Sequence, residues 1–231
     1  MTITLYDLAG AEADRRFSPF CWRTRLALAH KGLAVETVPW RFTEKDVLAP
    51  SKQGRVPVVV DGGKWISDSL VIADYLEATY PDRPSLFGGP AGRAATRFVQ
   101  GWGDTVLHPA IARFVILDVW KHIDARDKDY FRKSREERFG MTLEAVQEGR
   151  EDRLAAFRQA LQPLRSLLEA QPFVGGERPL YGDYIVFGGF QWARNISDFK
   201  LLEPGDPVHA WRERMLDLYG GLARESKGYA V

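Results

Sequence analysis

The sequence predicts an α/β N-terminal half followed by an all-helical C-terminal half. Short segments rich in β-branched residues alternate with helical segments in the first part of the chain. Proline and glycine then interrupt it at Pro81-Asp82-Arg83-Pro84 and Gly88-Gly89-Pro90. Beyond these interruptions the apolar residues recur every three or four positions, which is typical of helices. We therefore expect a first domain at 1–83, a linker at 84–92 and a helical domain at 93–231.

The first elements follow from local signals. Residues 2–7 alternate and are β-branched, which predicts a strand. Ser18-Pro19 predicts a helix start, because serine suits the N-cap and proline the first helical position. Gly32 suits the position just after the helix end. A second short strand is expected at 34–39.

The next elements complete the domain. Val56 to Asp61 reads as a third strand, and Asp61-Gly62-Gly63-Lys64 as a hairpin turn into a fourth at Trp65-Ile66. A helix is expected from about Ser69. Residues 40–52 carry no clear signal. The order β-α-β followed by β-β-α is that of a thioredoxin-like domain.

The C-terminal part gives helical signals of uneven strength. Apolar residues at Leu154, Phe157 and Leu161 begin one stripe, which Pro163 is expected to kink or break. Asp206-Pro207 predicts the start of a last helix. Ser134-Arg135-Glu136-Glu137 is interpreted as a capping box. The segment 118–153 is dense in charge and is not assigned further.

Composition excludes several classes of function. Lysine and arginine total 32 against 31 acidic residues, so no polyanion-binding surface is predicted and nucleic acid is not an expected partner. No apolar run reaches the ~20 residues of a membrane span, and the N-terminus lacks a signal peptide pattern. The single Cys21 and four scattered histidines favour neither a disulfide nor a metal site. We expect a cytoplasmic protein.

Ser18-Pro19-Phe20-Cys21 carries the first chemical signal. The pattern is similar to the Cys-Pro-aromatic-Cys motif of glutaredoxins, with serine in place of the nucleophilic cysteine. Such a serine does not exchange disulfides, but its hydroxyl can stabilise the thiolate of a ligand, helped by the helix N-terminus. The other interpretation is that Ser18 only caps its helix.

Two further positions each have a structural and a functional interpretation. Val56-Pro57 is either an ordinary trans proline at a strand entry or a cis peptide that turns the Val56 backbone toward an extended peptide ligand. Asp68-Ser69 is either a helix cap or a holder for the charged end of a ligand.

Together these motifs resemble the glutathione site of cytosolic glutathione S-transferases. The similarity rests on Ser18 to Arg25, Gly54-Arg55-Val56-Pro57 and Asp68 to Leu76. The rest of the chain is similar to the bacterial lignin β-aryl etherases and their fungal relatives. The motifs that carry this second similarity are Phe87-Gly88-Gly89-Pro90, Ser134-Arg135-Glu136, Gly149-Arg150-Glu151-Asp152-Arg153, Asp183-Tyr184-Ile185 and Phe190-Gln191-Trp192.

The resemblance implies a role for each matching residue. Ser18 is expected to be the catalytic residue that hydrogen-bonds the glutathione sulfur, while Cys21 is expected to be buried and inert. The other residues expected to bind glutathione are Phe20, Lys52 or Gln53, Arg55, Val56, Pro57, Asp68 and Ser69. The hydrophobic substrate site is expected between the domains, with Phe20, Trp102, Val106, His108 and Phe114 as candidates.

One departure from the family pattern concerns the helix that starts near Asp183. The family has a Ser, Thr or Asn cap three residues earlier, where this chain has Leu180. Asp183 is expected either to cap alone or to be helped by another group, with an effect on stability of about 1 kcal/mol.

The resemblance implies a glutathione transferase for bulky aromatic electrophiles, with β-aryl ether cleavage as one form. The alternative is a glutathione-dependent ligandin that binds phenolic compounds without turnover. A thiol reductase is disfavoured because it needs a cysteine at position 18. A homodimer is expected by analogy with the family.

Overall fold

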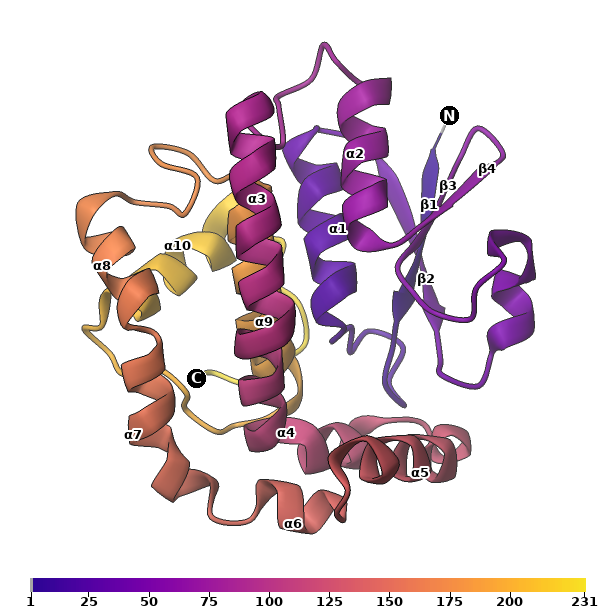
Figure 1. Ribbon diagram of the computed structural model, residues 1–231. Helices are drawn as coiled ribbons and strands as arrows, with labels where there is room; N and C mark the ends of the chain where they lie inside the picture. The colour runs from indigo at the N-terminus through magenta and orange to yellow at the C-terminus, as the bar shows by residue number, and fades with distance from the viewer. Residues whose placement is uncertain (1) are drawn as a thin grey trace.

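A four-stranded mixed sheet organises the N-terminal domain of the computed structural model, which describes residues 2–231 (Figure 1). The strands lie in the order β2-β1-β3-β4. β2 is parallel to β1, whereas β3 is antiparallel to both of its neighbours. This arrangement confirms the predicted thioredoxin-like domain. The strands are β1 (Ile3–Leu8), β2 (Val35–Trp40), β3 (Val58–Asp61) and β4 (Lys64–Ser67).

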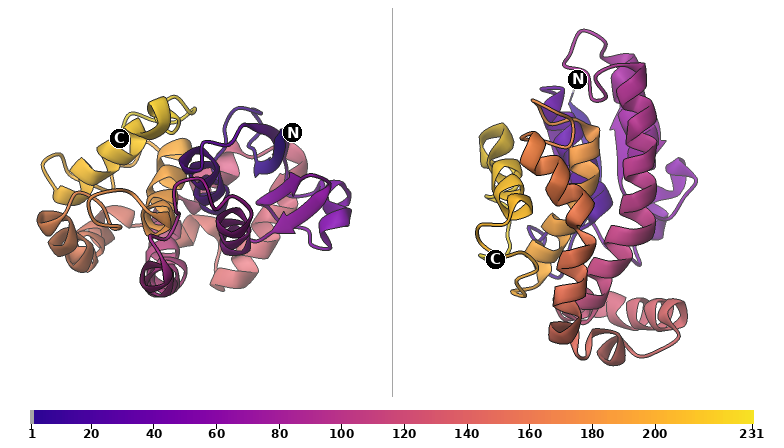
Figure 2. Two further views of the ribbon diagram at one scale, coloured as in Figure 1. Left: turned by 90° about the horizontal axis from the view of Figure 1, so that it is seen from above. Right: turned by 60° about the vertical axis from the view of Figure 1, so that its left-hand side comes forward.

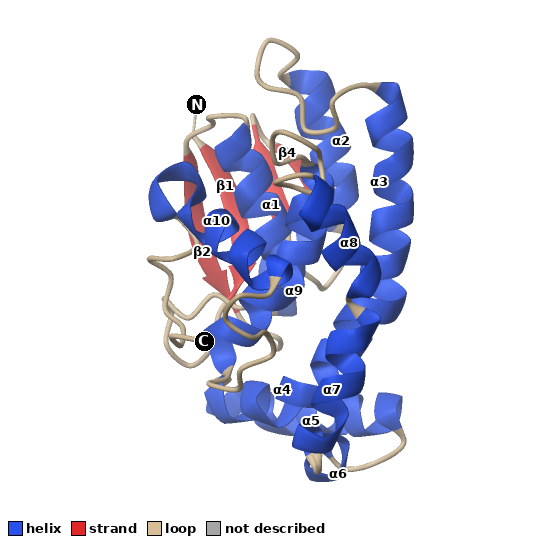
Figure 3. Ribbon diagram, turned by 90° about the vertical axis from the view of Figure 1, so that its left-hand side faces the viewer, coloured by secondary structure: helices blue, strands red, loops and turns tan. Residues whose placement is uncertain are grey.

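Two helices, α1 (Pro19–His30) and α2 (Ser69–Thr79), pack against one face of this sheet (Figures 1 and 3). As predicted, α1 is capped by Ser18, and Gly32 follows its end with a φ of +62°. The stretch that carried no clear signal contains a short 3₁₀ helix, Lys45–Ser51.

The helical domain is built around a central helix that packs along α1 (Figures 1 and 3). The first three segments of the helical domain, α3, a π-helical segment and α4, follow one another without a break in helical backbone angles. Residues 90–122 therefore form one long, bent helical rod that faces the first domain. The helices are α3 (Pro90–Trp102), the π segment Gly103–Leu107, α4 (His108–His122), the 3₁₀ turn Ala125–Asp127, α5 (Lys128–Phe139), α6 (Leu143–Gln147), α7 (Arg150–Ala160), α8 (Gln162–Ala170), the central α9 (Tyr181–Ile196) and α10 (Pro207–Gly221).

The structure corrects some local predictions and confirms others. α3 begins at Pro90, so the last residues of the expected linker are helical. The predicted capping box at Ser134 is wrong, because Ser134 lies inside α5, whose N-cap is Asp127. The Ser134 hydroxyl donates to the Phe131 carbonyl instead. Pro163 does break the helical stripe, since α7 ends before it and α8 begins around it. Asp206 caps α10 as predicted.

Asp183 replaces the missing cap of α9 with a larger network. Its carboxylate accepts hydrogen bonds from the backbone N–H groups of Val174 (2.7 Å), Gly175 (2.9 Å) and Leu180 (3.0 Å). It also accepts one from the indole N–H of Trp211 (3.0 Å). Leu180 itself supplies no side-chain acceptor. The side chain of Asp183 therefore ties the 174–180 loop, α9 and α10 together in the fully buried centre of the domain.

Two negative findings apply to residues 2–231. None of the helices there is both long enough and apolar enough to cross a lipid bilayer. Within the same residues, no three His, Cys, Asp or Glu side chains are grouped so that they could hold a metal ion.

Candidate active site between the two domains

Ser18 lies at the start of α1, where the N-terminal domain meets α9. Its Oγ accepts a hydrogen bond from the Cys21 N–H (3.2 Å). That bond uses an oxygen lone pair and leaves the hydroxyl proton available for an acceptor. The start of α1 approaches α9 closely, because a Cβ at Gly188 would lie 2.5 Å from the Pro19 carbonyl oxygen. Glycine at 188 therefore lets the helical domain hold the N-terminus of α1 in place.

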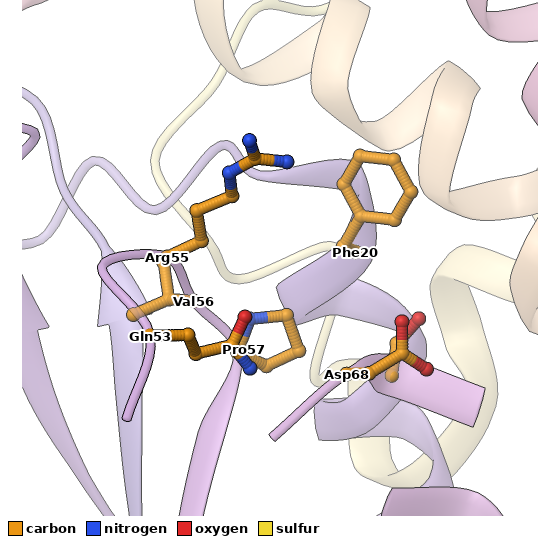
Figure 4. A pocket seen from close by; sticks show the side chains of 7 residues that line it. Phe20, Gln53, Arg55, Val56, Pro57 and Asp68 are labelled. Atoms are coloured by element: carbon orange, nitrogen blue, oxygen red, sulfur yellow. The ribbon is translucent and has the colours of Figure 1, made fainter. Parts of the chain in front are cut away.

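A cavity of about 180 Å³ lies in front of the strand β3 entry and the α2 N-terminus. Gln53 and Arg55 stand at one end of it and Asp68 at the other, with Pro57 between them (Figure 4). The Val56-Pro57 peptide is cis, as the functional interpretation required. The elongated arrangement suits an extended ligand. The residues that line this cavity are Phe20, Gln53, Arg55, Val56, Pro57, Asp68 and Ser69.

Asp68 caps α2 and adopts an unusual backbone conformation. Its Oδ1 accepts from the N–H groups of Leu70 (2.9 Å) and Val71 (3.1 Å). Its φ of +73° costs energy in a non-glycine residue and is found mostly where surrounding structure enforces it, often at ligand sites. The next residue is fixed from the other domain, because the Tyr181 hydroxyl on α9 donates to the Ser69 carbonyl (2.5 Å). The backbone at the Asp68 end of this cavity is thus tied to the helical domain.

A second cavity of about 620 Å³ adjoins the first and contains Ser18. The two cavities share Phe20, Arg55 and Val56. A ligand atom bound to the Ser18 hydroxyl therefore lies near the junction of the two cavities, where a ligand in one can contact a ligand in the other. The wall of the larger cavity is largely aromatic and aliphatic, and includes Phe17, Trp40, Phe42, Ile116, Val119, Phe131, Phe139 and Trp192.

The far wall of the larger cavity is formed by α5, a helix whose part in the site the sequence analysis missed. Tyr130, Ser134, Arg135 and Arg138 all line the cavity from this helix. Tyr130, Ser134 and Arg138 follow one another at steps of four residues, and Arg135 lies one turn before Arg138, so they share one side of the helix. That periodicity could have predicted a cavity-lining face on this helix. The segment was not assigned because it is dense in charge and because Ser134 was interpreted as part of a capping box.

His108 belongs to a buried polar cluster at the junction of α1 and α4. The Arg23 guanidinium donates to Asp104 (2.6 Å) and lies 3.3 Å from Nδ1 of His108. Burial, followed by the charge of Arg23, lowers the pKa of His108 to about 3. The imidazole is therefore neutral. It lines the cavity beside Phe20, with ring centroids 5.6 Å apart, but this environment argues against proton transfer by His108 to a leaving group.

Several predicted site residues lie elsewhere. Lys52 is exposed and lines neither cavity, whereas Gln53 does. Trp102 and the exposed Val106 also line neither cavity. Phe114 is buried against Phe157 and Phe199 and belongs to the core of the helical domain. Of the four candidates on this rod, only His108 reaches the cavity.

Cys21 is buried without exposure to solvent. Burial, followed by the nearby Asp7 carboxyl, raises the pKa of its thiol well above the ordinary value. A neutral and inaccessible thiol is not a nucleophile. This environment agrees with the expected inert role.

The thioredoxin-like domain carries a cavity for an extended ligand, and the helical domain closes a second, largely apolar cavity beside it. This combination defines a class of thiol-ligand-binding proteins. The sequence matches the family described as glutathione S-transferase, N-terminal domain, over residues 13–84. Residues 94–203 match glutathione S-transferase, C-terminal domain. The chain belongs to the glutathione S-transferase superfamily.

Individual relatives agree with this assignment. The glutathione S-transferase-like protein ustS of Aspergillus flavus is 30% identical over 68% of this chain, and the match spans 56% of that protein. A probable glutathione S-transferase of Oryza sativa is 28% identical over 85% of this chain and 80% of its own length. Among solved structures, a glutathione transferase from Phanerochaete chrysosporium is 28% identical, with a TM-score of 0.78 over 97% of this chain and 94% of the other. A glutathione S-transferase of Ceriporiopsis subvermispora, solved in complex with glutathione, is 25% identical with a TM-score of 0.77 over the same shares of the two chains.

Proposed function

We propose that this protein binds glutathione as a cosubstrate and transfers its sulfur to an aromatic electrophile. The observation that carries the proposal is the position of Ser18, at a helix N-terminus and on the larger of two connected cavities. Glutathione fits the smaller cavity with its glycyl carboxylate toward Arg55 and its γ-glutamyl end toward Asp68 and Ser69. The Val56 backbone then pairs with the cysteinyl residue, and the sulfur reaches the Ser18 hydroxyl.

The chemistry requires a thiolate more than it requires acid–base groups. A free thiol has a pKa of about 8.5, so a shift of about two units, or about 2.7 kcal/mol, makes it mostly ionised at neutral pH. A hydrogen bond to a charged group contributes about 1.5–3 kcal/mol, and a helix N-terminus about 0.3–1 kcal/mol. Ser18 and the α1 N-terminus together contribute about 1.8–4 kcal/mol, a range that includes the required amount. The aromatic walls of the larger cavity then hold the electrophile and exclude water.

We further propose β-aryl ether cleavage as the specific reaction. The glutathione thiolate attacks the carbon that carries the ether oxygen, forms a carbon–sulfur bond, and expels the phenolate with the electron pair of the broken carbon–oxygen bond. The larger cavity, at about 620 Å³, has room for two aromatic rings.

This function is tested with purified protein, glutathione, a model β-aryl ether that releases a chromogenic phenolate, and 1-chloro-2,4-dinitrobenzene. We expect glutathione-dependent release of phenolate and a glutathione conjugate of matching mass. Conjugation of the chloroarene alone would support the transferase and contradict the etherase. Tight binding of the ether without any product from either compound would instead identify a ligandin.

We also propose that the protein is a homodimer that uses the outer face of α3. Seen from above, α3 stands at the edge of the molecule (Figure 2). Phe98 on this helix is 80% exposed, and its exposed neighbours Ala94, Ala95 and Gly101 would allow another surface to approach closely. A second copy of the chain would bury this face.

Replacing Phe98 by glutamate is expected to shift the protein from dimer to monomer at micromolar concentration, because a charge at the centre of an apolar contact is costly to bury. Light scattering coupled to size-exclusion chromatography measures the mass directly. Val47→Glu is the matched control, since Val47 is also an exposed apolar residue but lies in the 3₁₀ segment away from α3 (Figure 1). Equal masses for wild type and both variants would contradict the α3 interface.

A further inference from the structure

The larger cavity contains a cluster of cations without counterions. Arg55, Arg135 and Arg138 line it, and no carboxylate within residues 2–231 lies within 4.0 Å of their guanidinium groups. The one acidic side chain in the lining, Asp104, is already bonded to the buried Arg23 (2.6 Å). The cavity that contains Ser18 therefore also presents positive charge without counterions.

Arg135 is held in a fixed position within this wall. Its guanidinium lies over the Phe131 ring (4.6 Å to the centroid) and the Phe42 ring (5.2 Å). One of its terminal nitrogens donates to the Ser134 hydroxyl (2.8 Å). A guanidinium that lies over ring faces can use its edge for a planar, two-point contact with a carboxylate.

The three arginines repel one another at the partly buried Arg135, whereas Arg55 and Arg138 are exposed. Burial, followed by the charge of Arg138, lowers the pKa of Arg135 to about 10; Tyr130 opposes this shift and Arg55 adds to it. An anion placed among these groups would remove that repulsion and would be attracted more strongly than in open water. A site of this kind favours an anionic ligand over a neutral one of the same shape.

This anion site is distinct from the smaller cavity. None of the residues that line the smaller cavity comes from α5, whereas Arg135 and Arg138 are both on that helix. Arg55 is shared by the two cavities and is already assigned to the glycyl carboxylate of glutathione. The two arginines of α5 therefore remain for the second substrate.

We propose that Arg135 and Arg138 bind a carboxylate on the second substrate, so that the natural electrophile is an aromatic acid whose ring lies among Phe42, Phe131 and the other aromatic residues of the wall. This inference rests on the proposed transferase function for the orientation of the electrophile toward Ser18. The anion site itself does not depend on turnover.

The test compares 4-chloro-3-nitrobenzoate with its methyl ester and its amide. In each case the glutathione thiolate adds to the ring carbon and chloride leaves, and only the acid carries a charge at the opposite end. We expect kcat/KM, divided by the uncatalysed rate constant with glutathione, to favour the acid at least tenfold. Arg135→Gln/Arg138→Gln is expected to bring that preference close to one, and Arg138→Lys to retain part of it.

Lys133→Ala is the matched control, because Lys133 is an exposed cation of the same helix that does not line the cavity. It is expected to leave the preference for the acid unchanged. A wild-type enzyme that does not distinguish acid from ester would overturn the proposal. The double variant could instead raise the KM for glutathione equally with the acid and with the ester. That result would assign the two arginines to glutathione and would also overturn the proposal.

A binding measurement separates this inference from the function on which it rests. Titration calorimetry of the protein with unreactive 4-amino-3-nitrobenzoate and its amide needs no turnover. Binding of the acid that is at least tenfold tighter than that of the amide, and that is lost in the double variant, would support the anion site even if no transferase activity is found. Equal binding of acid and amide would contradict the anion site whatever the activity.

Discussion

Ser18→Ala is expected to lower turnover at neutral pH about tenfold or more while most of the affinity for glutathione survives. The Ser18 hydroxyl is proposed to donate a hydrogen bond to the thiolate, worth about 1.5–3 kcal/mol, whereas the other proposed glutathione contacts come from residues 53, 55–57 and 68–69. Removing a donor to the charged form raises the pKa of the bound thiol by about one to two units. Less thiolate is then present at neutral pH.

The pH dependence distinguishes this mechanism from a general loss of structure. In the wild type, thiolate absorbance and kcat/KM should rise together through the pKa of bound glutathione. In Ser18→Ala both curves should shift to higher pH by the same amount, and the activities should converge at alkaline pH. An activity that is low at every pH, or that does not change at all, would remove Ser18 from thiolate stabilisation.

Two further variants serve as controls for Ser18. Ser18→Thr keeps a hydroxyl at the N-cap and should restore much of the activity. Loss of the cap alone costs about 1 kcal/mol, and Thr142→Ala reproduces this loss far from the site, because Thr142 caps α6 through a bond from the Ala145 N–H (3.2 Å). Thr142→Ala is expected to leave turnover unchanged.

The sequence predicted best those features of the site that depend on local backbone. Ser18, Pro57 and Asp68 each stand at the start of a helix or strand, where the residue type reveals the local geometry. Glutathione binding is proposed to use that geometry directly. The part of the smaller cavity at Pro57 and Asp68 could therefore be located from short motifs before any tertiary contact was known.

The larger cavity could not be located in this way, because it depends on how helices dock. Phe114 and Trp102 have the apolar character of a ligand wall, yet the rotation of the rod turns Phe114 into the core and leaves Trp102 outside the cavity. Conversely, Arg135 looks like a solvated surface charge in the sequence. Only the packing of α5 across the domain boundary places it against Phe42, more than ninety positions earlier in the chain.

Asp183→Ala is expected to cause the largest loss of stability of the changes considered. Its carboxylate accepts four N–H donors in a fully buried position, from Val174, Gly175, Leu180 and Trp211. Burial raises the pKa of the Asp183 carboxyl, and these donors oppose that shift. Alanine leaves several donors without an acceptor, at about 1–3 kcal/mol for each that stays unsatisfied. We expect the free energy of unfolding to fall by about 3–5 kcal/mol, measured by urea denaturation.

Asparagine at 183 tests whether charge or shape supplies this stability. Asp183→Asn keeps the volume, but its NH₂ group would point toward N–H donors and repel them, so we expect it to recover less than half of the loss. Thr142→Ala, which removes an exposed cap with a single bond, should cost about 1 kcal/mol. If Asp183→Ala cost no more than Thr142→Ala, the four bonds would not act as one buried network, and the attachment of α9 to α10 would have to come from apolar packing around Trp211 alone.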